Sequence, residues 1–156
     1  MPVVELETWI AAPPERVFDM ARDIGLHLVS MAHHRERAVG GATSGLIRLG
    51  ESVTWRARHF GVPLTLTSRV VEFDRPRRFR DVQERGPFAH FDHVHAFERV
   101  SDATLMRDRV DYASPLGPIG RLADAAFVQR AVAKLIAERA NAIKEASECA
   151  TTPDDP

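Results

Sequence analysis

The strongest constraint on how this chain folds is residues 79–97, FRDVQERGPFAHFDHVHAF, where apolar and polar residues alternate on both sides of Gly86-Pro87. Side chains of a β-strand point alternately to opposite faces, so residues two apart share a face. The segment therefore predicts two strands joined by a turn at the Gly-Pro pair. One face of this hairpin carries Phe79, Asp81, Gln83, Phe91, His93, His95 and Phe97.

This face combines phenylalanines with a carboxylate, an amide and two imidazoles, whereas the opposite face carries charged residues typical of solvent exposure. A polar group that is buried without a hydrogen-bond partner costs roughly 1–3 kcal/mol. The polar groups on the phenylalanine face must therefore pair with one another or meet a wet space. We interpret this face as the lining of a pocket.

Counting along the hairpin predicts which of these residues lie opposite each other. A three- or five-residue connection centred on Pro87 places Asp81 opposite His93. Directly opposed residues have Cβ atoms about 4.5–5.5 Å apart, which is close enough for a carboxylate to contact an imidazole. A slip of two residues would instead pair Gln83 with His93, so the sequence defines the grouping better than the pairing.

A second hairpin extends the same polar group. A turn at residues 100–103 leads into a strand predicted over residues 103–112, and a four-residue turn places His95 opposite Asp108. Asp108 shares its face with the apolar residues of that strand. The sequence therefore predicts that carboxylates and imidazoles from three neighbouring strands converge.

The rest of the chain predicts further strands and two helical regions. Further strands are expected at residues 3–10, 51–60 and 63–74. A proline pair at residues 13–14 suits the first turn of a short helix, and residues 23–33 form either a second short helix or an irregular loop. The run at 33–37 is expected to be a solvated surface, and glycines make residues 40–50 flexible. Helical spacing of apolar residues predicts one long helix over residues 119–147.

Composition excludes several classes of protein. With 156 residues, 44% of them hydrophobic, the chain is expected to form one domain with a substantial core. A net charge of −1 gives no electrostatic basis for binding nucleic acid or an anionic membrane. No apolar stretch approaches the roughly 18 residues of a membrane span, and no signal peptide is visible. A single cysteine, Cys149, excludes an internal disulfide, and we expect a cytoplasmic location.

Strands grouped together with segregated helices favour the α+β class. The pattern F-x-D-x-Q-x-x-G-P-F-x-x-F-x-H-x-H-x-F, followed by D-R-V-D-Y-x-x-P-L-G-P-I-G, resembles the ligand-binding SRPBCC branch of the START/Bet v 1-like helix-grip superfamily. The early I-A-A-P-P-E-R-V-F-D is similar to that family's junction between first strand and first helix. The resemblance implies a curved antiparallel sheet of about seven strands, wrapped around a long C-terminal helix and a hydrophobic cavity. We expect one such domain over residues 1–148 and a disordered tail at 149–156.

We expect this domain to bind a small hydrophobic or amphipathic molecule. The residues predicted to contact it are Gln83, Trp55, Phe79, Phe91, Phe97, Tyr112, Leu66 and Phe127. The resemblance also allows a cofactor-independent enzyme of polyketide cyclase or dehydratase type. His93 and His95 would then be its catalytic acid and base, oriented by Asp81 and Asp108. A purely structural polar network, and a partner-binding module with a vestigial cavity, remain as alternatives.

The pair His93-x-His95 also suits a metal site, with Asp81 or Asp108 as a further ligand. The same carboxylates serve equally well as hydrogen-bond partners of the imidazoles. We therefore expect neither a metal nor another cofactor. The basic turn RPRRFR at residues 75–80 is expected to be solvated rather than an anion site. No nucleic-acid partner is expected, and a homodimer stays among the options.

Overall fold

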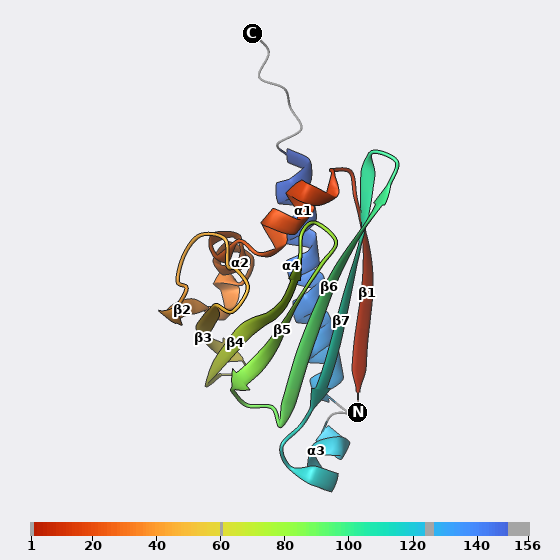
Figure 1. Ribbon diagram of the computed structural model, residues 1–156. Helices are drawn as coiled ribbons and strands as arrows, with labels where there is room; N and C mark the ends of the chain where they lie inside the picture. Colours follow the sequence, from red (N-terminus) through yellow and green to blue (C-terminus); the bar gives the residue numbers. More distant parts are fainter. Residues whose placement is uncertain (1, 60, 124–126, 150–156) are drawn as a thin grey trace.

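The computed structural model describes residues 2–59, 61–123 and 127–149. A seven-stranded antiparallel sheet forms its framework, in the order β1-β7-β6-β5-β4-β3-β2 (Figure 1). The strands are β1 (Val3–Ile10), β2 (Arg37–Gly41), β3 (Ser52–His59), β4 (Val62–Asp74), β5 (Arg78–Arg85), β6 (His90–Val100) and β7 (Ala103–Ala113). Consecutive strands from β2 to β7 are neighbours, and β1 pairs with β7 at the far edge.

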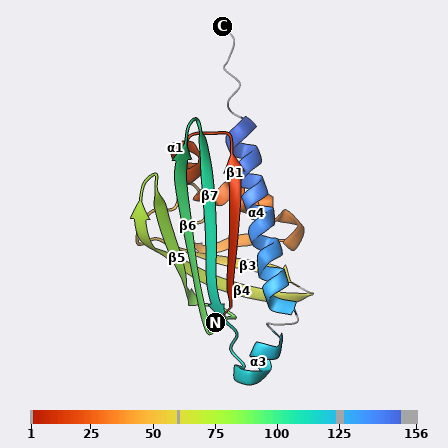
Figure 2. The same ribbon diagram turned by 90° about the vertical axis from the view of Figure 1, so that its right-hand side faces the viewer.

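All but one of the helical segments lie against one face of this sheet. They are α1 (Pro14–Ala21), α2 (Ile24–Ser30), the 3-10 turn η1 (Ala32–His34), α3 (Gly117–Ala123) and α4 (Gln129–Cys149). Figures 1 and 2 show α4 running along the sheet, with α1 and α2 linking the β1 edge to the β2 edge. The predicted α+β helix-grip fold is confirmed. No helix within the described residues is long and apolar enough to cross a bilayer.

The helix α1 closes one end of the space between α4 and the sheet. Pro14 stands in its first turn, as expected for a residue without an N–H group. Phe18 is fully buried, and its ring meets those of Phe73, Phe79 and Phe97 edge-on at centroid distances of 5.2, 5.2 and 5.3 Å. Burying an aromatic side chain of this size stabilises the fold by about 1.5–3 kcal/mol.

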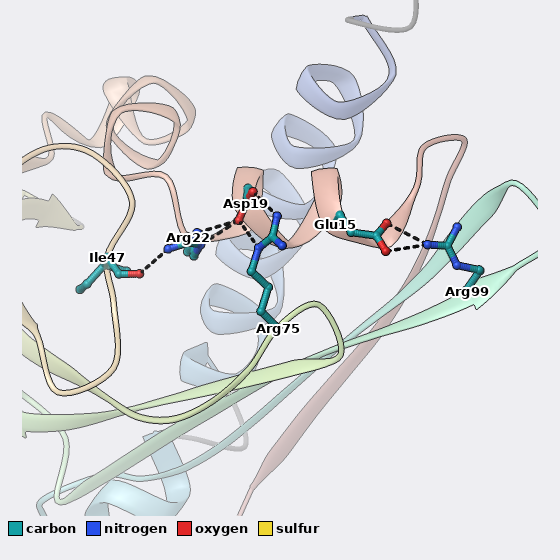
Figure 3. A network of polar contacts seen from close by, with 6 residues as sticks. All are labelled: Glu15, Asp19, Arg22, Ile47, Arg75 and Arg99. Atoms are coloured by element: carbon teal, nitrogen blue, oxygen red, sulfur yellow. Dashed lines mark hydrogen bonds and ion pairs between the residues drawn. The ribbon is translucent and has the colours of Figure 1, made fainter.

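Ion pairs fix α1 to the ends of two hairpins (Figure 3). Asp19 accepts hydrogen bonds from Arg22, the residue that follows the helix, and from Arg75, in the turn between β4 and β5, at 2.8 and 2.7 Å. Glu15 accepts from Arg99, near the end of β6, at 2.7 Å. These contacts hold the helix over the closed end of the fold.

The basic turn at 75–80 is neutralised by the protein itself. Its ion pairs are Arg75–Asp19, Arg77–Asp74, Arg78–Glu72, Arg80–Glu72 and Arg80–Asp92. Because every arginine of the turn contacts a carboxylate, nothing here favours the anion site that the basic cluster could have formed.

The predicted helix over 119–147 is wrong at its start. The structure has α3 and α4 as separate helices, with residues 124–126 outside the described part. Ile119 and Leu122, predicted on the buried stripe, are 73% and 74% exposed. A continuous helix would be roughly 40 Å long. Figure 2 shows that α3 lies beyond the end of the sheet, which agrees with the exposure of Ile119 and Leu122.

The structure differs from the sequence-based expectations at two further places, the strand β2 and the C-terminal tail. The strand β2 was not predicted; it is a short edge strand whose pairing with β3 shifts between Ala38 and Gly40. Gly41 ends it at φ 68°, where an added Cβ would lie 2.1 Å from the Ser52 carbonyl oxygen. Of the predicted tail, Cys149 belongs to α4 and residues 150–156 lie outside the described residues.

Candidate functional site

A cavity of about 560 Å³ lies between α4, the α1–α2 region and the strands β3 to β6. Its volume falls within the range of about 300–1,000 Å³ typical of small-molecule sites. The wall is mainly apolar, with Ile24, Met31, Val53, Leu64, Val132 and Ile136 among its residues.

Five of the predicted contact residues line the cavity: Trp55, Leu66, Phe79, Phe91 and Phe127. Asp81, His93 and His95 line it as well. The predicted convergence of aromatic and polar groups on one hollow therefore agrees with the geometry for these eight residues. Phe127 stands at its edge, since its side chain is 51% exposed.

Phe97 and Tyr112 point to the predicted face of the sheet but belong to the core rather than to the cavity lining. Phe97 is 4% exposed and packs against Phe18 of α1. Tyr112 is fully buried in a cluster with Val132 and Ile136 of α4. The helices fill the two ends of the sheet face, and sequence alternation alone does not show where along a strand such filling occurs.

Gln83 also lies outside the cavity lining. Its Nε2 donates to the Phe88 carbonyl oxygen at 2.8 Å, and its Oε1 accepts from the Phe88 N–H at 3.3 Å. The side chain therefore holds the turn between β5 and β6, and the cavity lining gives no support to its predicted contact with a ligand.

The predicted strand register is confirmed. Asp81 pairs with His93, and His95 with Asp108. The side chains, however, cross between positions. His95 Nδ1 lies 2.8 Å and His93 Nε2 lies 3.1 Å from the same Asp108 Oδ1, while Asp81 Oδ1 lies 3.3 Å from His95 Nε2. We refer to Asp81, His93, His95 and Asp108 as the floor network.

Burial and hydrogen bonding set opposite protonation tendencies in the two imidazoles. Burial opposes the charged form of His95, but hydrogen bonds to Asp108 and Asp81 outweigh it and raise the pKa. Burial and the charge on His95 lower the pKa of His93. Burial would raise the pKa of Asp108, but hydrogen bonds from both imidazoles depress it instead. The network therefore favours a His95 imidazolium between two carboxylates, beside a neutral His93.

A neutral His93 donates its Nε2 hydrogen to Asp108, so its Nδ1 carries a lone pair. No described residue forms a hydrogen bond with this nitrogen, and His93 lines the cavity. The arrangement offers a hydrogen-bond acceptor, or a base, to a molecule in the cavity.

The same groups have the composition of a metal site, because one ligand atom each of Asp81, His93 and His95 lies within 4.8 Å of the others. Each ring nitrogen of His95 already lies close to a carboxylate oxygen, however, at 2.8 Å for Nδ1 and 3.3 Å for Nε2. A ligating imidazole needs one deprotonated nitrogen for the metal. The contacts therefore favour a shared-proton network at this position.

Sequence reasoning missed a second polar group in the cavity wall. Arg139 of α4 donates from Nη1 to His27 Nδ1 and from Nη2 to the Ala21 carbonyl oxygen. Because His27 accepts at Nδ1, its Nε2 carries the hydrogen that it donates to Glu36 at 2.6 Å. Burial and the charge of Arg139 lower the pKa of His27 to about 4, which agrees with this neutral tautomer.

A signal for Arg139 was present in the sequence. It lies seven residues after Val132, three after Ile136 and four before Ile143, on the stripe that α4 buries. A cation at such a position must reach either a partner or a cavity. Among the described residues, no carboxylate lies within ion-pair distance of its guanidinium.

The run at 33–37, predicted to be a solvated surface, is partly internal. His34 and Glu36 line the cavity, whereas His33, Arg35 and Arg37 are exposed. The packing of η1 against α4 and β3 brings the run inward, and no sequence period indicates such a contact.

Comparison with known proteins identifies a matching family and several similar structures. Residues 1–148 match the family described as polyketide cyclase / dehydrase and lipid transport. The fold is similar to TTHA0849 from Thermus thermophilus, with 20% identity, a TM-score of 0.78, and coverage of 97% of this chain and 100% of that one. A START superfamily protein from Mycobacterium smegmatis has 14% identity and a TM-score of 0.71, with coverage of 96% and 99%.

Norcoclaurine synthase from Thalictrum flavum is also similar, with 12% identity, a TM-score of 0.69, and coverage of 93% of this chain and 85% of that one. A comparison with curated proteins finds no significant match. At these identities the solved structures show the fold alone, whereas the family match spans almost all of the sequence. The chain therefore belongs to the polyketide cyclase / dehydrase and lipid transport family of the SRPBCC superfamily.

Proposed function

We propose that this protein binds one small amphipathic molecule in the cavity. The observation that carries the proposal is a volume of about 560 Å³ whose wall is mainly apolar and whose polar groups are few. An apolar body would contact Trp55, Leu66 and Phe91, and a polar end would meet the floor network and Arg139. Sites of this kind gain affinity from apolar contact and orientation from a few placed polar groups.

Arg139 supports a polar or anionic end on the molecule. A guanidinium taken out of water without a carboxylate partner is costly, and its two described hydrogen bonds go to neutral acceptors. Arginine has five N–H donors. A ligand carboxylate or other acceptor would satisfy donors that the described residues leave unused.

A cavity-filling variant tests the proposal. Leu66 points into the cavity, and the adjacent Thr65 is exposed on the opposite face of β4. The fluorescence of anilinonaphthalene sulfonate, an amphipathic anion, should rise saturably with the wild-type chain and with Thr65→Trp. The affinity for this probe should be at least about tenfold weaker in Leu66→Trp, because the indole ring would occupy part of the cavity. A tenfold loss corresponds to about 1.4 kcal/mol of binding free energy. Equal binding by both variants would overturn the proposal.

Native mass spectrometry of the purified chain supplies the ligand's mass. A co-purifying small molecule should be present on the wild type and on Thr65→Trp and absent from Leu66→Trp. The same bound mass on all three proteins would place it outside the cavity.

A second candidate function is cofactor-independent cyclase or dehydratase chemistry, favoured by the unengaged Nδ1 of His93. His93 would take a proton from carbon beside a carbonyl group, and Asp108 would hold the ring. A protonated His95 would stabilise the negative charge that develops on the carbonyl oxygen, and Asp81 would hold the His95 ring. With a poly-β-carbonyl substrate, His93→Gln should lower kcat by about 10²–10⁴-fold. A protein that binds the substrate but never turns it over is a binder only.

The proposal also covers the location of the protein and its partners. We place the protein in the cytoplasm, on the ground that its single cysteine suits a reducing compartment. We propose no nucleic-acid partner and leave a homodimer open. A partner-binding module is the reading that survives if filling the cavity changes no binding activity.

A further inference from the structure

We propose that His33, His34 and Glu138 form a site for one divalent transition-metal ion, zinc in the first instance. His33 and His34 come from the turn η1, and Glu138 comes from α4, more than a hundred residues later in the chain. Neither the ligand-binding proposal nor the floor network uses these three side chains. The proposal therefore stands independently of the proposed function.

The ligand atoms already converge. His33 Nε2 lies 2.9 Å and His34 Nε2 lies 3.4 Å from the same oxygen, Glu138 Oε2. One ligand atom from each of the three residues lies within 4.8 Å of the others. The neighbouring Lys134 contacts the other carboxylate oxygen, Oε1, at 3.8 Å, and so leaves Oε2 to the imidazoles.

These separations match those around a tetrahedral ion. Zinc binds imidazole nitrogen and carboxylate oxygen at about 2.0–2.2 Å. Two such bonds at a tetrahedral angle place their ligand atoms about 3.3 Å apart. The two nitrogen–oxygen distances, 2.9 and 3.4 Å, lie on either side of this value. Small side-chain rotations would admit the ion.

The donor set selects the metal. Two neutral imidazoles and one carboxylate suit zinc, cobalt or nickel, whereas calcium and magnesium prefer oxygen ligands. Three protein ligands leave a fourth position open for water or another group.

The turn is held in place for such a role. The N–H of His34 bonds to the Met31 carbonyl oxygen, and the N–H of Arg35 bonds to that of Ala32, both at 3.0 Å. The His59 ring of β3 lies 4.7 Å from the His34 ring, between centroids, and both residues line the cavity. His59 is therefore a candidate for the fourth ligand.

The test is titration of the chelator-treated, untagged full chain with zinc chloride in a calorimeter. We expect one zinc per chain. His34→Ala and Glu138→Gln should each weaken binding by at least about tenfold, as expected when a metal site loses a group that holds it. His90→Ala removes an exposed histidine at the start of β6 and should leave the affinity unchanged. With cobalt(II), the wild type should give the visible absorption of a tetrahedral ion, and His34→Ala should not.

Three results would overturn the proposal. One is zinc binding weaker than millimolar; a second is equal affinity in His34→Ala, Glu138→Gln and the wild type. The third is zinc binding that is lost in His95→Gln but kept in His34→Ala, since the ion would then sit in the floor network. Circular dichroism at the titration temperature shows whether each variant is folded, and Glu138→Gln preserves shape if His34→Ala does not fold.

Discussion

The floor network and the mouth cluster of His33, His34 and Glu138 both place imidazoles beside carboxylates, in different surroundings. In the floor network, Asp108 is 4% exposed and His95 3%. At the mouth, the side chains of His33 and Glu138 are 53% and 25% exposed. The difference shows how far burial, rather than residue identity, decides what an imidazole beside a carboxylate does.

In the floor network the low dielectric strengthens each charge interaction. The pKa of His95, which contacts two carboxylates, is therefore raised, whereas the pKa of His93 is lowered by burial and by the charge on His95. Each of the two N–H groups of a protonated His95 faces a different carboxylate, and an added cation would have to displace one of these hydrogens. At the mouth the side chains are more exposed, and a cation competes only with weak surface contacts between the imidazoles and Glu138. Proton chemistry is therefore expected at the floor and metal chemistry at the mouth.

The largest expected effect tests the floor. Asp108→Asn removes the charge that both imidazoles contact and should lower the free energy of unfolding by about 3–5 kcal/mol, the loss typical of breaking a buried ion pair. Urea unfolding measures it. The control Asp111→Asn alters the outward face of the same strand and should cost less than about 1 kcal/mol. Equal losses would mean that the floor network is no more tightly coupled than a surface pair.

The acid side of the stability curve tests the cavity wall. His27 has a pKa of about 4 when folded and 6.5 as its ordinary value, so the unfolded chain takes up a proton first as the pH falls. This contribution is complete above pH 6.5 and is lost between pH 6.5 and about 4. The difference corresponds to about 3 kcal/mol. In His27→Gln this part of the acid loss should disappear from urea unfolding measured between pH 7 and 4.

His95 sharpens the same measurement, because its pKa changes in the opposite direction. Its stabilisation is complete below pH 6.5 and is lost as the pH rises through the raised folded pKa. The advantage of the wild type over His95→Gln should therefore shrink from pH 6 towards higher pH. An advantage that grows with pH would contradict a protonated His95 between Asp81 and Asp108.

A pair of probes tests Arg139. In Arg139→Met, affinity for anilinonaphthalene sulfonate should fall about tenfold, or 1.4 kcal/mol, since its sulfonate loses a buried cation. The uncharged N-phenylnaphthylamine should bind as before. Arg130→Met, which changes an exposed arginine near the start of α4, should affect neither probe. An equal loss for both probes would indicate that Arg139 shapes the wall and does not recognise charge.

Much of the sheet could be predicted because strand geometry is local. Alternation assigned the face of every residue in the floor network, and hairpin arithmetic gave the pairs Asp81–His93 and His95–Asp108 that the structure confirms. The hydrogen bonds nevertheless cross between positions. Side chains on neighbouring positions lie within reach of one another as well, so register defines a group and leaves rotamers to choose the contacts.

The helices were harder to predict because their contacts come from distant parts of the chain. Arg139 and His27 meet only when α4 packs beside α2, so neither stretch of sequence indicates the other. Phe97 was predicted in the cavity, but α1 covers it. His33 and His34 form one charged run in sequence, and only the position of α4 brings them to the same carboxylate.

The smallest effect on stability is expected for Glu138→Gln, which makes the same change from carboxylate to amide in the mouth cluster as Asp108→Asn makes in the floor network. In metal-free buffer, Glu138→Gln should cost less than about 1 kcal/mol, since solvent screens its contacts with His33 and His34. In excess zinc, the wild type should melt at a higher temperature than in chelator, because a ligand that binds only the folded state stabilises it. Glu138→Gln should lose that increase while Asp108→Asn, compared at its own lower melting temperature, keeps it. Metal dependence that follows Asp108 instead of Glu138 would reverse the assignment of proton chemistry and metal chemistry to the two clusters.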